Sequence, residues 1–455
     1  MIHPFKTYDR STDYLLPPSL TDWLPKNHLA YFVVDIIEKL DFSGIKQCYS
    51  PGGAKAYAPE ILTGLLFYGY MTGVFSSRKI EMATRESLAF RYIAANQHPD
   101  HDTIADFRNR FLPQLEKIFL QILVIAAEMG IRKVGSISLD GTKIKANASR
   151  HKALSWGYAN KLEEQLKVEI KDLLRQAEIA NQADNEDKGI NIPEEITRRE
   201  NRLKAIDEAK KKIAARAQER YVREKEEYDQ KMKKREAIKN SGQSPKGNPP
   251  TEPSPEPLDK DQVNLTDEES RIMKVSDGGF EQSYNAQASV DVESLLIVGV
   301  HVSIKPNDKK EIVPAIKELK KLPEFFVEAE NLLADTGYHS AANIEECLKE
   351  NIHPLIAEKR EKHHLSPNER FAEPEPLEEN ATAAQRASYR LKTQEGKKLY
   401  AKRKTTVEPV FGIIKQVMGF RQFMLRGYEK VKGEWRLVAA AWNIKRLHKI
   451  AVDMA

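Results

Sequence analysis

Residues 134–152 read VGSISLDGTKIKANASRHK, and this stretch marks the first strand of a predicted sheet. The apolar run that begins RKVGSISL ends at Asp140, and a glycine follows at once. The basic side chains that come next are Lys143, Lys145, Arg150, His151 and Lys152. Sites on α/β sheets lie in crevices at strand ends. We therefore interpret Asp140 as a carboxylate at the tip of a buried strand, surrounded by positive charge.

Strand-like and helix-like segments alternate after residue 280. The predicted strands are QSYNAQASVDV (282–292), SLLIVGVHVSI (294–304), NLLADTGYHS (331–340) and IHPLIAEK (352–359). The first alternates apolar and polar residues, as a half-buried strand does, and the second is apolar enough for a central strand. Helices are predicted at KKEIVPAIKELKKL (309–322) and SAANIEECLKE (340–350). This order predicts an α/β fold with a mixed sheet.

Residues 1–130 have helical apolar spacing and are predicted to form an all-α domain. Two segments, 76–95 and 102–111, begin with the cap residues Ser76–Ser77 and Asp102–Thr103 and carry several arginines. They are compatible with a helix-turn-helix that binds DNA. An ordinary helical bundle with a solvated charged face explains the same residues, and both interpretations stay open here.

The middle of the chain separates two parts of the predicted sheet. Residues 131–158 are predicted to form the first part of the α/β core. Residues 159–240 are dense in Lys, Glu and Arg, and their apolar residues recur in steps of three, four and seven, which predicts a long helical hairpin inserted after the first strand. Residues 241–262 are rich in proline and predict a linker. Residues 263–455 then supply the remainder of the core with basic C-terminal helices.

Composition narrows the class of protein. The 455 residues include 72 Lys and Arg against 67 Asp and Glu, a net charge of only +5. DNA binding would therefore require clustered basic residues. Two cysteines, Cys48 and Cys347, make no disulfide framework and favour a reducing compartment. The longest apolar run, IFLQILVIAA at 118–127, is too short to span a bilayer. We expect a cytoplasmic protein without a membrane segment.

Three acids are candidates for a catalytic site. Asp140 and Asp335 each follow an apolar run and precede a small turn, although aspartate before glycine is also a common turn former. Glu408 adjoins a helical apolar stripe, and Lys415 lies seven residues further on the same edge. Thr405 and Glu408 also match a capping box, so the glutamate has a purely structural alternative.

The charge around Glu408 favours a polyanion as ligand. Residues 397–449 contain fourteen Lys and Arg and only three Glu, a local net charge of +11. Three carboxylates can hold two Mg²⁺ or Mn²⁺ ions, which prefer oxygen ligands. Two such ions clamp the attacking and leaving oxygens of a phosphodiester. The sequence therefore predicts metal-dependent chemistry on DNA.

Several stretches resemble the DDE transposases of bacterial insertion sequences. They are SLDGTKIKANASRHK, SRIMKVSDGGFEQSYNAQASVDV, LLADTGYHSAANI, YAKRKTTVEPVFGIIKQVMGFRQFMLRG and the ending AAWNIKRL. Tyr400, Arg403, Glu408 and Lys415 fill the Tyr–Arg–Glu–Lys pattern of that family. The step from Arg403 to Glu408 is one residue longer than the common form, and Lys404 stands at the shorter distance.

The resemblance implies an RNase H-like mixed sheet with flanking helices. It implies that Asp140, Asp335 and Glu408 bind two Mg²⁺ or Mn²⁺ ions. It also implies DNA contacts, which we expect from Tyr400, Arg403, Lys404, Lys415, Lys143 and Arg421. The implied reaction is cleavage at the ends of an insertion sequence and transfer of the 3′-hydroxyl to target DNA, by a homo-oligomer, expected to be a dimer on DNA, in the cytoplasm and on the nucleoid. A metal-dependent nuclease without strand transfer and an inactive DNA-binding regulator are the alternatives.

Overall fold

The computed structural model describes residues 19–49, 55–131, 134–149, 152–182, 192–242, 244–245, 247–275, 278–323, 329–358, 374, 376–378 and 380–454. Arg150 and His151, two of the cations predicted around Asp140, lie outside these residues. The chain divides into two compact units, and each is described by itself. The first comprises Met1–Ala146, Met273–Gly279 and Ser283–Ala455, and the second comprises Asn147–Ile272 and Phe280–Gln282.

The N-terminal part of the first unit is helical in its described residues. Its helices are α1 (Leu20–Trp23), α2 (Leu29–Glu38), α3 (Ser43–Lys46), α4 (Pro59–Thr72), α5 (Ser77–Glu86), α6 (Leu88–Ile93), α7 (His101–Phe111), the 3₁₀ turn η1 (Leu112–Gln114) and α8 (Leu115–Glu128). Helix α4 is buried along most of its length and forms the centre of this group. The segment 76–95, predicted as one helix, is two helices separated at Ser87, and the side chain that caps α7 is Asp100.

The predicted mixed sheet is confirmed. Its strands are β1 (Ser136–Lys145), β4 (Arg271–Lys274), β5 (Phe280–Asp291), β6 (Ile297–Ser303), β7 (Asn331–Ala334) and β8 (His353–Ile356). They are ordered β4-β5-β1-β7-β8, and β6 also pairs with β5. Strand β1 is antiparallel to β5 and parallel to β7, and β8 is parallel to β7. This is the arrangement expected of an RNase H-like core.

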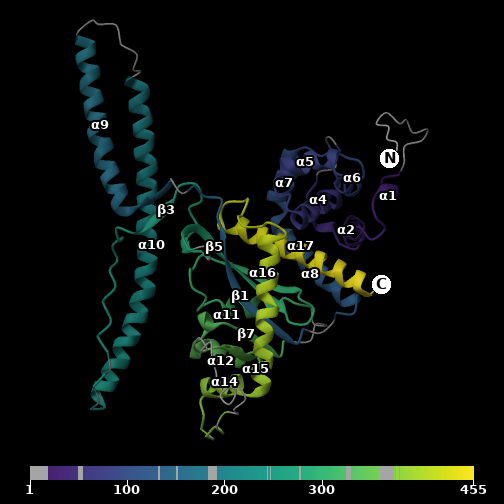
Figure 1. Cartoon of the computed structure of the whole chain (residues 1–455). Coiled ribbons are helices and arrows are strands. Elements are labelled where there is room, and N and C mark those ends of the chain that lie inside the picture. The colour runs from purple at the N-terminus through teal and green to yellow at the C-terminus, as the bar shows by residue number, and fades with distance from the viewer. Residues whose placement is uncertain are drawn as a thin grey trace, which may run out of the picture. The chain divides into compact units, whose positions relative to one another are not determined.

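Helices cover both faces of the sheet (Figure 1). The helices of the C-terminal half are α11 (Ile312–Leu319), α12 (Ala341–Lys349), α14 (Ala383–Lys392), α15 (Gln394–Ala401), α16 (Val407–Gln416) and α17 (Tyr428–Met454). On one face, Leu332 and Ala334 of β7 pack in a cluster with residues of α11 and α12. On the other face, Leu333 packs with Leu399 and Tyr400 of α15. A sheet covered on both faces holds its catalytic groups at its ends.

Two strand predictions were wrong in their burial or position. Strand β5 is buried on both faces from Gln282 to Asp291, so it is not half-buried. Its polar residues face other protein groups rather than water. Strand β6 pairs only with β5 among the described strands, so it is an edge strand and not a central one. Its apolar character arises because α11 and α17 pack against it, and the Asn443 side chain bonds both the N–H and the C=O of Ile297.

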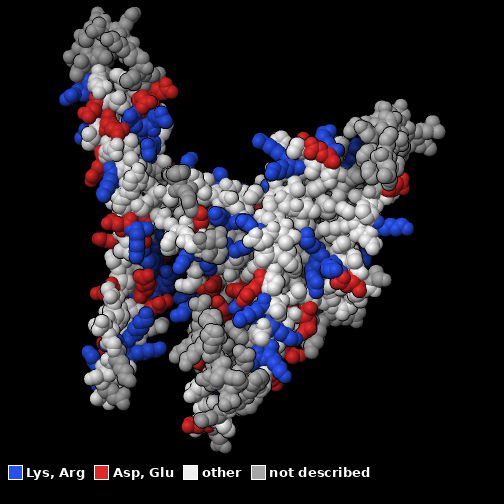
Figure 2. Space-filling model, in the orientation of Figure 1, with Lys and Arg blue, Asp and Glu red and all other residues white. Residues whose placement is uncertain are grey.

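The second unit contains the predicted helical pair. Its elements are α9 (Trp156–Gln182), α10 (Ile192–Asn240), β2 (Ala153–Ser155) and β3 (Gln262–Asn264). Leu162 and Leu166 of α9 pack against Ile206 and Ile213 of α10 in a small apolar core. Basic and acidic side chains are interspersed along both helices (Figure 2), as expected of a solvated face. Among the described helices of the whole chain, none has the length and apolar character that a membrane crossing needs.

The proline-rich segment is attached along α10 in its described residues. Arg220 of α10 donates to both carboxylate oxygens of Asp261 at 2.7 Å. Lys225 bonds Glu252 at 3.1 Å, and Arg235 donates to the carbonyl of Gly247 at 3.0 Å. The segment predicted as a linker therefore returns along the second half of α10, where polar contacts hold it.

Candidate active site

The sequence predicted Asp140 at the end of its strand. In the structure Asp140 lies in the middle of β1 instead. Pairing with β5 continues through Lys145, which lies opposite Ser283, whereas pairing with β7 stops at Ser138. Asp140 therefore comes two residues after β1 has lost its neighbour on one side. The strand is extended because the long β5 supports it, while the shorter β7 leaves an open edge for a carboxylate.

Asp335 comes directly after β7 and lies close enough to Asp140 to raise the pKa of that carboxyl. It precedes the 3₁₀ turn η3 (Thr336–Tyr338), and its Oδ1 accepts a hydrogen bond from the Gly337 N–H at 2.8 Å. The turn-forming role of this aspartate is thus real. It also fixes the carboxylate at the position where β1 and β7 separate, so the structural and functional interpretations are compatible.

Glu408 is brought to the same place by α16. The helix begins at Val407, and its N-cap Thr406 makes no side-chain cap bond. The hydroxyls of Thr405 and Thr406 donate instead to the carbonyl of Lys402. The capping-box interpretation of Glu408 is therefore wrong, and its half-exposed carboxylate is directed to another partner.

That partner is Arg403, which joins two of the three acids. Its Nη1 lies 3.2 Å from Asp140 Oδ2 and its Nη2 lies 2.9 Å from Glu408 Oε1. Arg403 belongs to the 3₁₀ turn η4 (Lys402–Thr405), between α15 and α16. This turn accommodates the additional residue in the spacing to Glu408. Arg403 and Glu408 therefore belong to different elements, and their side chains form an ion pair.

The environment of Asp140 opposes its ionisation. Burial raises the pKa of the Asp140 carboxyl to about 6, and repulsion from Asp335 and Asp308 acts in the same direction. The Gly141 N–H, at 2.8 Å from Asp140 Oδ1, and the Arg403 guanidinium lower the pKa. A nearby cation would favour the ionised form of such a carboxyl, because its charge would offset both the burial and the repulsion.

Two protein-family models match parts of the chain. Residues 256–444 match the family model described as transposase DDE domain, and residues 18–110 match the one described as transposase domain DUF772. No curated protein and no solved structure matches the chain. The chain carries a DDE transposase domain. A transposase domain at the N-terminus precedes it, and such a pair implies transposase activity.

The DDE domain as matched contains only two of the three acids. Asp335 and Glu408 fall within residues 256–444, whereas Asp140 lies outside both matched ranges. The placement of Asp140 beside the other two rests on the β1–β7 pairing and on its contact with Arg403. The long helical pair and the segment after it occupy the intervening sequence.

The predicted DNA-contacting residues surround this end of the DDE domain to different degrees. Lys404 and Arg421 are exposed, whereas Tyr400 and Lys415 are partly buried. Arg421 Nε donates to the carbonyl of Lys415 at 3.1 Å, so these two side chains come from one local structure at the end of α16. Lys143 is different, because its side chain is only 17% exposed and its ammonium pairs with Asp308 at 3.5 Å.

The acids of the DDE domain suit divalent cations by their chemistry. Carboxylate oxygens are the ligands that Mg²⁺ and Mn²⁺ prefer. Among the described residues, however, no group of three Asp, Glu, His or Cys side chains is arranged to hold a metal ion. In this structure the Arg403 guanidinium lies between Asp140 and Glu408 and pairs with both carboxylates.

Asp308 is an acid that sequence reasoning missed. It lies in the loop between β6 and α11 and interacts with the buried side chains of Asn285 and Gln287 in β5. The buried polar positions of β5 were the available signal, since they require partners. These polar positions were interpreted as facing solvent. Alternation of polar and apolar residues alone does not show whether the polar side chains meet water or a buried polar network.

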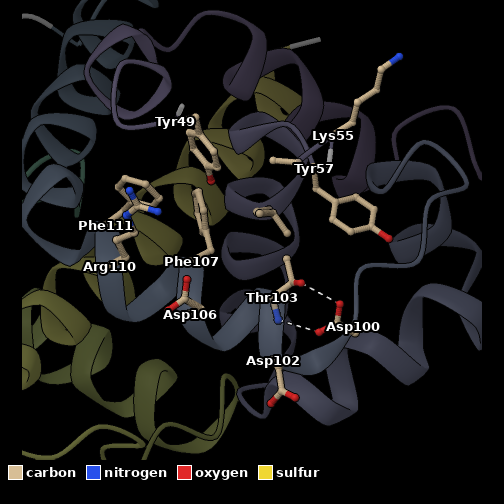
Figure 3. Close-up of a pocket in the computed structure, with 12 residues that line it drawn as sticks. Tyr49, Lys55, Tyr57, Asp100, Asp102, Thr103, Asp106, Phe107, Arg110 and Phe111 are labelled. Atoms are coloured by element: carbon tan, nitrogen blue, oxygen red, sulfur yellow. Dashed lines mark hydrogen bonds between the residues drawn. The ribbon is translucent and has the colours of Figure 1, made fainter. Parts of the chain in front are cut away.

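The N-terminal helices contain a separate hollow of about 460 Å³ (Figure 3). Aromatic rings of Tyr49, Tyr57 and Phe107 line it, together with the carboxylates of Asp102 and Asp106. Lys55 and Arg110 also line it, so its wall carries charges of both signs. Of the arginines predicted in this region, Arg108 is buried and donates to the carbonyl of Phe75 at 3.0 Å. It therefore supports the helices from inside.

Proposed function

We propose that the chain is the transposase of a bacterial insertion sequence. It cuts the phosphodiester at the ends of the element with water and joins the freed 3′-hydroxyl to target DNA by transesterification. The single observation that carries this proposal is the contact of Arg403 with both Asp140 and Glu408. That contact links an acid outside the matched DDE region to one inside it and completes a set of three acids with Asp335.

In this proposal Asp140, Asp335 and Glu408 hold two Mg²⁺ or Mn²⁺ ions. When bound, such ions polarise the scissile phosphate and stabilise the charge on the attacking and leaving oxygens. The protein positions the carboxylates by three independent elements: the open edge of β1, the turn after β7 and the first turn of α16. No covalent protein intermediate is part of the mechanism.

Arg403 has a specific place in it. Its guanidinium pairs with both Asp140 and Glu408, while its Nε is buried without a hydrogen-bond partner among the described residues. An unsatisfied buried donor indicates an arrangement that a ligand can improve. We assign Arg403 the arginine's role in the Tyr–Arg–Glu–Lys pattern, contacting a phosphate of the element's end. Lys404, exposed beside it, contacts the DNA backbone more generally.

The remaining predicted contacts are proposed to hold different parts of the DNA. Tyr400, Lys143 and Lys415 are proposed to hold the strand that is cut. Arg421 extends the basic surface beyond α16. The N-terminal residues 1–130 are proposed to recognise the element's ends, a role supported by the match of residues 18–110 to a transposase domain. Two ends must be brought together, so we propose a dimer on DNA, in the cytoplasm and on the nucleoid.

The test combines the protein, Mg²⁺, DNA carrying the element's end and a supercoiled target plasmid. We expect cut ends and end–plasmid joints, and we expect Asp335→Ala to lose both while binding end DNA as the wild type does. Cutting without joints would show a nuclease without strand transfer. Binding without cutting, equal in wild type and variant, would show an inactive DNA-binding regulator. Either result would overturn the proposal.

A further inference from the structure

A fourth carboxylate lies at the same end of the sheet, toward its other face. Asp308 Oδ1 accepts hydrogen bonds from Asn285 Nδ2 at 2.6 Å and from Gln287 Nε2 at 2.7 Å. The ammonium of Lys143 lies 3.5 Å from the same oxygen. Both charged side chains are largely buried, with 22% of Asp308 and 17% of Lys143 exposed. One oxygen thus collects three donors from two neighbouring strands.

The glycine after Asp140 makes this arrangement possible. Gly141 lies opposite Gln287 and Lys143 lies opposite Asn285 in the β1–β5 ladder, so these four residues share one face. A Cβ on Gly141 would meet Gln287 Nε2 at 2.1 Å and Asp308 Oδ1 at 2.9 Å. Only glycine leaves room for the Asp308 carboxylate to approach β1. The Asp–Gly pair in the sequence therefore joins an acid on one face to space for another acid on the opposite face.

The same network reaches the turn that carries Asp335. Gln287 Oε1 accepts a hydrogen bond from the hydroxyl of Tyr338, a fully buried residue of η3. Asn343 Nδ2 donates to the carbonyl of Tyr338 at 2.6 Å and to that of Lys309 at 2.8 Å. The turn after β7 is thereby attached both to β5 and to the loop that holds Asp308.

A carboxylate at this position is costly unless it has a charged partner. Asparagine would accept the two amide hydrogen bonds without a charge. A neutral residue would not balance Lys143, whose pKa burial lowers and Asp308 raises. The negative charge of Asp308 therefore balances the positive charge of Lys143.

We propose that Asp308 is a positioning residue of the DDE site, which pairs with Lys143 and, through Gln287, fixes the turn of Asp335 against β5. This inference rests on the proposed function for its catalytic consequence. Asp308 acts through Lys143 and through the Gln287–Tyr338 contact.

The test compares Asp308→Asn, Lys143→Gln and the double variant in single-turnover cleavage at saturating end DNA and fixed salt. We expect each single variant to cut about tenfold more slowly or worse, with the affinity for end DNA changed less than about threefold. The double variant should be no slower than the slower single variant, because both act on one contact. The control is Glu345→Gln, which removes an exposed acid of α12 and should cut at the wild-type rate. Wild-type cleavage by Asp308→Asn, or losses that multiply in the double variant, would overturn the inference.

A second measurement does not depend on activity. Reductive methylation of the intact protein, read by mass spectrometry, compares Lys143 with the exposed Lys309 in the same molecule. Without Asp308, the buried ammonium loses its counter-ion and its neutral, reactive form becomes more populated. We expect Asp308→Asn to increase the relative labelling of Lys143 at least severalfold. Unchanged labelling overturns the pairing. Increased labelling in a protein that never cuts DNA supports the pairing and overturns the proposed function instead.

Discussion

Asp140 illustrates how the burial of a single carboxyl lowers stability. Its carboxyl is buried, with Asp335 and Asp308 nearby, and burial raises its pKa to about 6. In the unfolded chain the same group titrates near 4. The folded protein therefore binds a proton more tightly than the unfolded chain does. Stability is lost as the pH rises from about 4 to about 6, and it stays lower above that range.

The first prediction follows for Asp140→Asn in the presence of a chelator. Because asparagine does not ionise, the variant should be more stable than the wild type at pH 8, by on the order of 2 kcal/mol. The difference should shrink toward pH 4, where the wild-type carboxyl is neutral too. Denaturant unfolding at both pH values measures it. A variant that is less stable at pH 8 would mean that the attraction of Arg403 outweighs burial.

At the scale of elements, α16 shows what the sequence could and could not predict. The buried stripe of Val407, Phe411 and Ile414 was predicted from spacing and is found. The 3₁₀ turn η4 directs the Arg403 side chain toward Asp140. It was not predictable, because it depends on a contact with β1, which is far away in the sequence. The extent of β1 was missed for a similar reason, since a partner strand in another part of the chain determines where it ends.

The second prediction concerns Lys415, in the last turn of α16. Glu408 is in the first turn of the same helix, seven residues earlier, so both side chains lie along one edge. If Lys415 orients the scissile phosphate, Lys415→Ala should slow single-turnover cleavage roughly a hundredfold or more at saturating DNA. Lys430→Ala, an exposed lysine of α17, is the control and should cut normally. Equal rates for both variants would reduce Lys415 to a general backbone contact.

At the scale of the first unit, α17 connects the N-terminal helices with the catalytic core. Glu434 is fully buried and accepts hydrogen bonds from the Tyr70 hydroxyl of α4 at 2.7 Å and from the Leu425 N–H at 3.0 Å. Trp435, next to it, donates to the carbonyl of Gln287 in β5 at 2.9 Å. The sequence indicated this helix by its resemblance, but its buried glutamate entered only the count of local charge. A composition count has no information on burial.

The third prediction is that Glu434→Gln weakens the N-terminal helices and the core together. The amide leaves at least one buried donor without an acceptor and removes the charge opposite Arg108, so the free energy of unfolding should fall by about 3 kcal/mol. Glu429→Gln is the matched control, because that side chain is 80% exposed on the same helix. It should change stability by less than about 1 kcal/mol.

Hydrogen exchange then locates the effect of Glu434→Gln in the molecule. Amides of α4 and of residues 424–425 should both exchange faster in Glu434→Gln, because they share one carboxylate. Faster exchange confined to α17 would show that the N-terminal helices are held by their own packing and do not depend on Glu434.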